Sequence, residues 1–237
     1  MPARGRGFGH TVPTWQARSE GIEHVFTVSA APPLFVLRTC ELIMVHASAA
    51  SAKTLLRAQM KAVRAMAALD HPDAAHGLIA HFPPSHLGQF DIIAGYFPLG
   101  SEIDPRPLMA YLAQAGARLA LPRVVAGAPL SFHQWQASDP LERSGFGVAE
   151  PFADSPPCRP DLILVPMLAF DAKGGRMGYG QGHYDRTLAA LRAAGDVFAL
   201  GLAFEAQRVA VLPVEDHDET LDGILTQMRY IPVQRNP

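Results

Sequence analysis

Apolar residues recur at helical spacing in several segments of the chain. In the segment 48–70, which is rich in Ala, Leu, Met, Lys and Arg, the residues Leu56, Met60 and Val63 fall on one face. Such a stripe predicts an amphipathic helix. Prolines in the first turn and a closing glycine predict a second helix over 104–116, and a short third helix is predicted over 187–194.

Other segments are apolar without interruption. The clearest is DLILVPMLAFD (161–171), a run typical of a strand that is buried on both faces of a parallel sheet. Because strands alternate with helices, the pattern predicts an α/β domain with a mostly parallel central sheet, and ligands of such sheets bind beyond the carboxyl ends of the strands. The chain has no internal repeat and no Ser/Gly linker, so we expect one domain, residues 48–237. The other predicted strands are 90–98, 117–125, 129–136 and 197–204.

Residues 1–47 show neither the helical nor the strand period. Their most apolar part, APPLFVLRTCELIMVHASAA, is interrupted by Arg38 and Glu41, so it is too short and too charged for a membrane span. It also lies too far along the chain for a typical signal peptide. We expect residues 1–47 to be a poorly ordered extension, or an over-long reading frame whose true start is Met44.

Composition excludes several classes of protein. The 237 residues are 49% hydrophobic and 18% charged, with a formal net charge of −2, which is typical of a soluble globular protein without a basic surface for nucleic acid. The two cysteines, Cys40 and Cys158, cannot build a disulfide framework or a zinc cluster by themselves. We therefore expect a reduced, cytoplasmic protein without nucleic-acid or membrane partners.

A glycine-rich stretch, GRMGYGQGHYDRT (175–187), separates the predicted strand 161–171 from the helix that follows. Its glycines Gly178, Gly180 and Gly182 can adopt positive φ, which lets successive N–H groups turn inward and form a nest for an anion. The helix N-terminus adds a positive dipole that suits a phosphate. The stretch lacks the Gly-Lys-Ser/Thr ending of a P-loop and the spacing of a dinucleotide-binding motif.

Charged residues around this loop favour a nucleotide-binding site over a glycine-rich turn that binds no ligand. Arg176 and Arg186 flank the glycines and can neutralise phosphate oxygens. Asp185 suits a Mg²⁺ ion that accompanies a nucleotide, and it can equally be the N-cap of the following helix. The residues alone leave both roles of Asp185 open.

The stretch DLILVPMLAFDAKGGRMGYGQGHYDRTL closely resembles the signature of the 5-formyltetrahydrofolate cyclo-ligase family, also called 5,10-methenyltetrahydrofolate synthetases. Further segments agree in the same order: the pair Lys53 and Arg57, then YFPLGSEID, LPRV, LSFHQW, GFGVAEP and the tail GLAFEAQRVAVLPVEDHDETLDGILT. The resemblance spans about residues 50–227. It implies a single three-layer domain of the NagB/RpiA/CoA transferase-like kind, with a mostly parallel central sheet flanked by helices.

The resemblance also implies a reaction. ATP, with Mg²⁺, converts the formyl oxygen of 5-formyltetrahydrofolate to a phosphate, N10 attacks the activated carbon, and loss of phosphate leaves 5,10-methenyltetrahydrofolate and ADP. Positioning and charge neutralisation are the main needs of phosphoryl transfer. The alternative is a non-catalytic folate- or nucleotide-binding protein on the same scaffold, and a third possibility is a sugar-phosphate isomerase. We expect a monomer.

Roles for individual residues follow from the resemblance. The implied ATP-binding residues are Lys53, Arg57, Gly178, Tyr179, Gly180, Gln181, Gly182, His183, Tyr184 and Asp185. The implied catalytic residues are Arg176, Tyr184 and Arg186, and the implied folate-binding residues are Glu102, Trp135 and Tyr184.

The implied metal ligands are Asp185 and Asp222. The stretch HDETLD offers two aspartates four residues apart, so Asp218 competes with Asp222 for this role. Gln181 departs from the family pattern, because many relatives carry Gly or Lys there. A glutamine cannot supply the positive charge of that lysine.

Overall fold

The computed structural model describes residues 49–145, 147–213 and 215–234. The expectation for residues 1–47 therefore lies outside the described residues. Within the described ranges, no helix is both long enough and apolar enough to cross a membrane.

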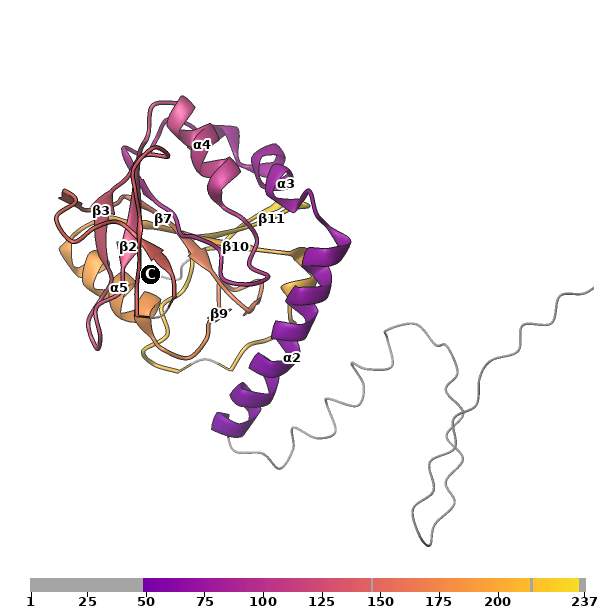
Figure 1. Ribbon diagram of the computed structural model, residues 1–237. Helices are drawn as coiled ribbons and strands as arrows, with labels where there is room; N and C mark the ends of the chain where they lie inside the picture. The colour runs from indigo at the N-terminus through magenta and orange to yellow at the C-terminus, as the bar shows by residue number, and fades with distance from the viewer. Residues whose placement is uncertain (1–48, 146, 214, 235–237) are drawn as a thin grey trace, which may run out of the picture. The chain divides into compact units, whose positions relative to one another are not determined.

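An eight-stranded sheet forms the middle layer (Figure 1). Five neighbouring strands, in the order β11, β10, β7, β1 and β2, run parallel, and antiparallel strands flank them on both sides. The full order is β12 (Tyr230–Pro232), β11 (Gly223–Thr226), β10 (Phe198–Ala203), β7 (Leu162–Pro166), β1 (Ile92–Ala94), β2 (Arg118–Arg123), β3 (Ser131–Gln134) and β6 (Pro157–Cys158).

Helices cover both faces of this sheet. The helices α3 (Ala74–His81) and α4 (Arg106–Gln114) pack on one face, and α5 (His183–Ala194) packs on the other (Figure 1). The long helix α2 (Ala49–Asp70) reaches the first face with its last turn and packs its middle against a small hairpin. Two short 3₁₀ turns, η1 (Pro84–His86) and η2 (Glu205–Gln207), complete the helical elements of the described ranges.

The central strand β7 shows why the sheet needs cover on both sides. Leu162 and Leu164 belong to the core beneath α3 and α4, whereas Ile163 and Val165 belong to the core beneath α5. All four side chains are buried, as the uninterrupted apolar run predicts. The expected three-layer α/β arrangement with a mostly parallel sheet is confirmed.

The prediction of one strand over 161–171 is wrong. The strand β7 ends at Pro166, and β8 (Ala169–Phe170) instead forms a separate hairpin with β9 (Arg176–Met177). The break has a clear cause: the Gln207 side-chain amide donates to the carbonyls of Met167 and Leu168, at 2.7 and 3.1 Å. At this point the hydrogen bonds to the backbone carbonyls come from the Gln207 side chain and not from a neighbouring strand.

Several other boundaries also differ. The helix predicted to begin at residue 187 begins at His183, so the last residues of the glycine-rich stretch are its first turn. The strand predicted over 90–98 is a strand only at Ile92–Ala94, and residues 95–99 have no regular secondary structure. Two further elements, the hairpin of β4 (Glu142–Arg143) and β5 (Ala149–Glu150), follow β3.

Candidate active site

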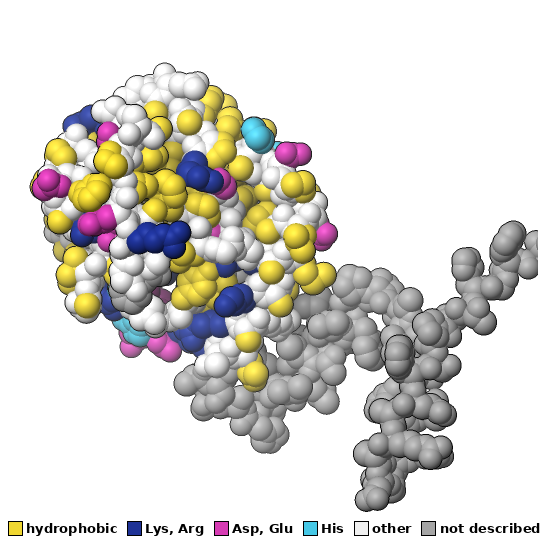
Figure 2. All heavy atoms as spheres, viewed as in Figure 1, with side chains coloured by type: hydrophobic (Ala, Val, Ile, Leu, Met, Phe, Trp, Pro, Cys, Tyr) yellow, Lys and Arg dark blue, Asp and Glu magenta, His cyan; other side chains and the backbone are white. Residues whose placement is uncertain are grey.

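A cavity of about 760 Å³ lies at the carboxyl ends of the parallel strands, where ligands of such sheets bind. The loops after β1, β2 and β7 line it, together with the glycine-rich loop, the first half of α2 and the segment 212–219. Figure 2 shows Lys and Arg side chains interspersed with apolar side chains on the face of the domain in view. The cavity thus combines a charged end with an apolar wall.

The glycine-rich loop has the geometry of an anion nest. Gly180 and Gly182 have φ of 91° and 65°, a region that side chains with a Cβ rarely adopt. Within the described part of the chain, no acceptor takes the backbone N–H groups of residues 179–182. Gly182 is also the N-cap of α5, so the N-terminus of this helix lies at the same loop. The loop therefore presents a concentration of unpaired donors to the cavity.

Asp185 is not the N-cap of α5, because Gly182 holds that position. Its carboxylate accepts a hydrogen bond from Arg176 Nη2 at 2.8 Å and another from the Glu219 N–H at 3.1 Å. Arg176 is itself nearly buried, and its Nε has no hydrogen-bond partner among the described residues. A buried guanidinium N–H without an acceptor is costly, so Arg176 retains a donor for a ligand.

The buried Asp171 stabilises the hairpin that carries Arg176. Asp171 Oδ1 accepts the N–H groups of Lys173 and Gly175, at 2.9 and 3.0 Å, and so closes the turn between β8 and β9. Its second oxygen accepts the Leu212 N–H at 3.1 Å. Asp171 thereby ties the hairpin that carries Arg176 to the segment that leads into residues 213–219.

Arg186 stabilises the glycine-rich loop through contacts with Gln181 and His183. Its Nη2 donates to the Gln181 carbonyl at 2.9 Å and lies 3.3 Å from His183 Nδ1. Burial, together with the nearby Arg186 charge, lowers the pKa of His183. The Gln181 side chain is exposed, so in this structure the residue contributes to the loop through its backbone.

The helix α2 brings two cations to the same end of the cavity. Lys53 is largely buried, and its Nζ forms ion pairs with Glu215 at 2.9 Å and Asp218 at 3.3 Å. Arg57 donates from Nε to the Gly178 carbonyl at 3.3 Å. Both side chains line the cavity, Arg57 at the glycine-rich loop and Lys53 at the segment that contains Glu215 and Asp218.

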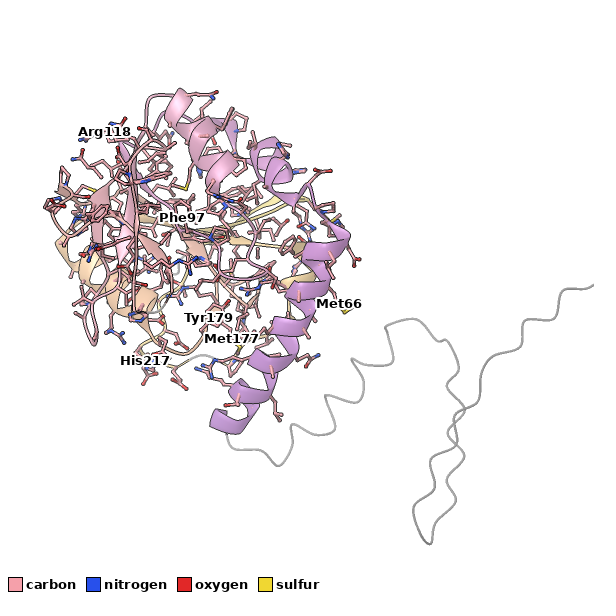
Figure 3. The ribbon with its side chains drawn as sticks, in the orientation of Figure 1. Met66, Phe97, Arg118, Met177, Tyr179 and His217 are labelled. Carbon is pink, nitrogen blue, oxygen red and sulfur yellow. The ribbon has the colours of Figure 1, made fainter. Side chains whose placement is uncertain are left out.

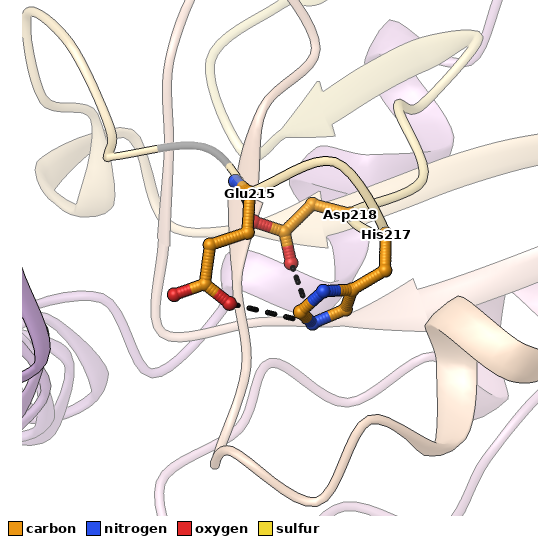
Figure 4. A group of neighbouring side chains, drawn as sticks. All are labelled: Glu215, His217 and Asp218. Atoms are coloured by element: carbon orange, nitrogen blue, oxygen red, sulfur yellow. Dashed lines mark hydrogen bonds and ion pairs between the residues drawn. The ribbon is translucent and has the colours of Figure 1, made fainter.

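The partners of Lys53 belong to an acidic cluster. Glu215, His217 and Asp218 place ligand atoms within 4.8 Å of one another at the rim of the cavity (Figure 4). Burial raises the pKa of Asp218, but hydrogen bonds from the Glu215 N–H and Lys53 outweigh it and lower that pKa overall. Asp218 is thus held as a carboxylate.

Glu102 also lines the cavity and is buried, with a side-chain hydrogen bond to Tyr179 of the glycine-rich loop. One carboxylate oxygen accepts the Leu99 N–H at 2.8 Å, and the other lies 3.4 Å from Arg64 Nη1. Burial raises the pKa of Glu102, against the opposing effects of the Leu99 N–H and the Arg64 guanidinium. The sequence analysis assigns no role to Arg64, whereas the structure places it at Glu102.

Two tyrosines line the cavity close to Glu102. Burial, and then the Glu102 charge, raises the pKa of Tyr184 well above its ordinary value. Tyr96, which the sequence analysis does not single out, is buried and donates its hydroxyl to the Ile103 carbonyl at 2.8 Å. Burial raises its pKa too. Both phenols therefore stay protonated and can act as hydrogen-bond donors.

The structure does not bring two of the implied residues to the cavity. Trp135 is part of the core beneath α3 and α4, with its ring edge-on to Phe97 at 5.7 Å, so Phe97 and not Trp135 lines the wall. Asp222 precedes β11 at the amino ends of the parallel strands, where it accepts from Arg192 at 2.9 Å and from the Ala199 N–H at 2.7 Å. Asp222 is therefore separated from Asp185, and Asp218 is the aspartate of HDETLD that lines the cavity.

The remaining residues lie around one cavity. Figure 3 shows Met177 and Tyr179 beside α2, with Phe97 and His217 labelled in the same view. The donor set near the glycine-rich loop is compatible with Mg²⁺, because Asp185, Glu215 and Asp218 offer the carboxylate oxygens that this ion prefers. Mg²⁺ in nucleotide sites takes one or two carboxylates and completes its shell with phosphate oxygens and water.

Fold and site together define an α/β protein with a glycine-rich loop of anion-nest geometry at the carboxyl ends of a parallel sheet. The sequence model of the 5-formyltetrahydrofolate cyclo-ligase family matches residues 49–227. The chain belongs to this family.

Individual relatives agree. The 5-formyltetrahydrofolate cyclo-ligase of Mycolicibacterium smegmatis is 37% identical over 155 residues, which are 60% of this chain and 77% of the relative. The Haemophilus influenzae enzyme of the same name is 30% identical over 178 residues, 72% of this chain and 95% of the relative. The solved structure of Aquifex aeolicus 5,10-methenyltetrahydrofolate synthetase superposes with a TM-score of 0.65 at 25% identity, covering 78% of this chain and 94% of that one.

Proposed function

We propose that the chain catalyses the ATP-dependent conversion of 5-formyltetrahydrofolate to 5,10-methenyltetrahydrofolate, with ADP and phosphate as the other products. The observation that carries this proposal is a single cavity lined both by the glycine-rich loop and by the buried Glu102. A reaction between two substrates needs the binding regions for both of them within one cavity. Membership of the cyclo-ligase family supports the same reaction.

The phosphate end supplies neutralisation and positioning. Lys53, Arg57, Arg176 and Arg186 surround the glycine-rich loop, and the unpaired N–H groups of residues 179–182 add further donors. In the reaction, the formyl oxygen bonds to the γ-phosphorus while ADP leaves. N10 then bonds to the formyl carbon and gives up its proton, and the carbon–oxygen bond breaks to release phosphate, which can carry that proton away. Each step disperses or moves negative charge, which fixed cations and N–H groups stabilise.

The folate end supplies recognition. Glu102 can accept hydrogen bonds from the ring N–H groups of a pterin, and the protonated hydroxyl of Tyr184 can donate to a carbonyl or formyl oxygen. The apolar wall suits an aromatic ring, because buried apolar area favours binding in proportion to its size. This wall contains Phe97, Leu99, Pro122, Val124, Leu130 and Val148.

We also propose Mg²⁺ as the metal, held by Asp185 and Asp218 together with the nucleotide. When bound, the ion would offset the negative charge that phosphoryl transfer develops on the phosphate oxygens. The chain's own part is to hold these carboxylates ionised: Arg176 pairs with Asp185, and Lys53 pairs with Asp218. We further propose that the protein works as a cytoplasmic monomer, which is compatible with the free thiol of Cys158.

One assay tests the reaction. The full-length protein is mixed with 5-formyltetrahydrofolate, ATP and Mg²⁺, and the chromophore of the methenyl product is followed. We expect a signal that requires ATP and that disappears when a non-hydrolysable ATP analogue replaces it. If folded protein binds 5-formyltetrahydrofolate but gives no ATP-dependent signal, the non-catalytic binding protein is the correct assignment.

A further inference from the structure

Arg64 is a buried guanidinium in the middle of the domain. Its side chain is 2% exposed, and that of its ion-pair partner Glu102 is 3% exposed. A charge at this depth costs several kcal/mol unless it is paired and hydrogen-bonded. The last two turns of α2 therefore contain a residue whose burial needs a specific set of partners.

All three guanidinium nitrogens have such partners. Nε donates to Ser101 Oγ at 3.2 Å, Nη1 to Glu102 Oε1 at 3.4 Å, and Nη2 to the Tyr179 hydroxyl at 2.5 Å. A further contact joins Nη2 to the Leu99 carbonyl at 3.5 Å. The planar fork of an arginine suits such a task, because its donors point in fixed directions.

The partners come from two separate loops. Ser101 and Glu102 follow β1, whereas Tyr179 lies among the glycines between β9 and α5. The Arg64 guanidinium also lies over the Tyr179 ring, 5.4 Å from its centre, which adds a cation–π contact to the hydrogen bond. One side chain thus spans the folate end and the phosphate end of the cavity.

The exposure of Tyr179 shows that the loop needs this support. Its side chain is 45% exposed, and Gly178 and Gly180 on either side provide no packing of their own. Tyr179 and Glu102 also share a side-chain hydrogen bond, so without Arg64 this contact would remain, but the buried Glu102 would lose its positive neighbour. Both residues therefore share this guanidinium as their charged partner.

We propose that Arg64 is a positioning residue that fixes Glu102 and Tyr179 relative to each other, and so couples folate recognition to the glycine-rich loop. The inference rests on the proposed function for the identity of the two ends. Arg64 does not line the cavity, so it acts through its partners and not by contact with a substrate.

The first test is Arg64→Met, which removes the charge and keeps an unbranched side chain. We expect the KM for 5-formyltetrahydrofolate to rise about tenfold or more, because a charge-assisted contact is lost and Glu102 is left buried without its partner. Lys61→Met is the matched control, since Lys61 is exposed on the same helix. We expect this control to retain wild-type kinetics.

A double-mutant cycle separates positioning from general support of the fold. If Arg64 acts through Glu102, adding Arg64→Met to Glu102→Gln changes the KM for 5-formyltetrahydrofolate by less than about twofold. If Arg64 only stabilises the fold, Arg64→Met should change the KM by the same factor in the wild-type protein and in Glu102→Gln. Additive effects, or wild-type KM in Arg64→Met, overturn the proposal.

Two further measurements keep the test independent of folding and of turnover. Arg64→Lys retains the charge with one donor group and should give a KM between those of wild type and Arg64→Met, with a thermal midpoint close to that of wild type. Equilibrium binding of 5-formyltetrahydrofolate should weaken in parallel with KM. If the wild type binds this folate without turnover, the reaction assignment fails while the binding data still decide on Arg64. If it does not bind, both proposals are overturned.

Discussion

Asp218 and Asp222 are four residues apart in the sequence, yet they lie at opposite ends of the parallel strands. Asp218 lines the cavity and pairs with Lys53, whereas Asp222 pairs with Arg192 beside the start of β10. The segment between them runs from the carboxyl ends of the parallel strands back to their amino ends. Sequence alone could not separate the two aspartates, because either of them fits a metal-binding motif.

This separation predicts different defects for the two amide variants. Asp222→Asn should lower the free energy of unfolding by about 1–3 kcal/mol, because it weakens a largely buried, charge-assisted network, and should leave kcat close to wild type. Asp218→Asn should raise the concentration of Mg²⁺ needed for half-maximal activity and change stability less. Chemical denaturation and Mg²⁺ titration of the activity distinguish them. A stable Asp222→Asn protein with a lost Mg²⁺ response would contradict this assignment.

At the scale of elements, the sequence pattern predicts long segments better than their ends. The helix over 48–70 and the strand β10 are close to their predicted bounds, because their apolar periods are unambiguous. The strand over 161–171 is broken by Gln207, which is distant in the chain, and local periodicity contains no sign of that contact. The helix α3 was not predicted, since its eight residues are too few to show a period.

The turn η1 illustrates another contact that periodicity does not reveal. His86 is surrounded by the rings of Phe82, Phe90, Phe198 and Tyr230, with centroids 5.1–6.3 Å from its own. In the sequence, His86 is the last of four histidines spaced five residues apart, a spacing that gives no sign of an aromatic environment. In the structure, it is part of the aromatic packing against the sheet.

This packing predicts a pH dependence of stability. Burial lowers the pKa of His86 below its ordinary value of 6.5, so the folded protein binds this proton less well than the unfolded chain does. Stability should therefore fall as the pH decreases through 6.5 toward the lower pKa of the folded state. In His86→Phe the loss of thermal stability between about pH 7.5 and about pH 5.5 should be smaller than in wild type.

A matched control is available for this experiment. His76 is exposed on α3, so His76→Gln should retain the wild-type decline of stability with acid. An identical decline in His86→Phe and wild type would show that His86 does not contribute to the pH dependence.

At the scale of the whole molecule, the α/β class, the parallel sheet and the position of the site at its carboxyl edge were all predictable. They follow from the alternation of strands and helices and from one glycine-rich loop. The network of Arg64, Glu102 and Tyr179 was not, because it joins three segments whose spacing along the chain has no regularity. The family resemblance identifies Glu102 as a site residue, but it does not identify Arg64, the ion-pair partner of Glu102.

The family match begins at residue 49, which predicts that the preceding residues are dispensable for the reaction. A protein that starts at Met44 should retain the thermal midpoint and the kcat/KM of the full chain. Thermal unfolding and the methenyl assay on both proteins check this. A marked fall in either quantity would show that residues 1–43 contribute to folding or activity.

The ion pairs of the cavity have a consequence for which anions it can admit. Within the described residues, Lys53 pairs with Glu215 and Asp218 and Arg176 pairs with Asp185, whereas Arg57 and Arg186 donate to backbone carbonyls. Arg57 and Arg186 are therefore the cations left to offset an incoming anion, and the neighbouring carboxylates oppose that anion. A nucleoside triphosphate carries more negative charge than these two arginines offset, and a divalent cation bound to it reduces the excess. We therefore expect the cavity to bind the metal complex of a nucleotide more tightly than the same nucleotide without its metal.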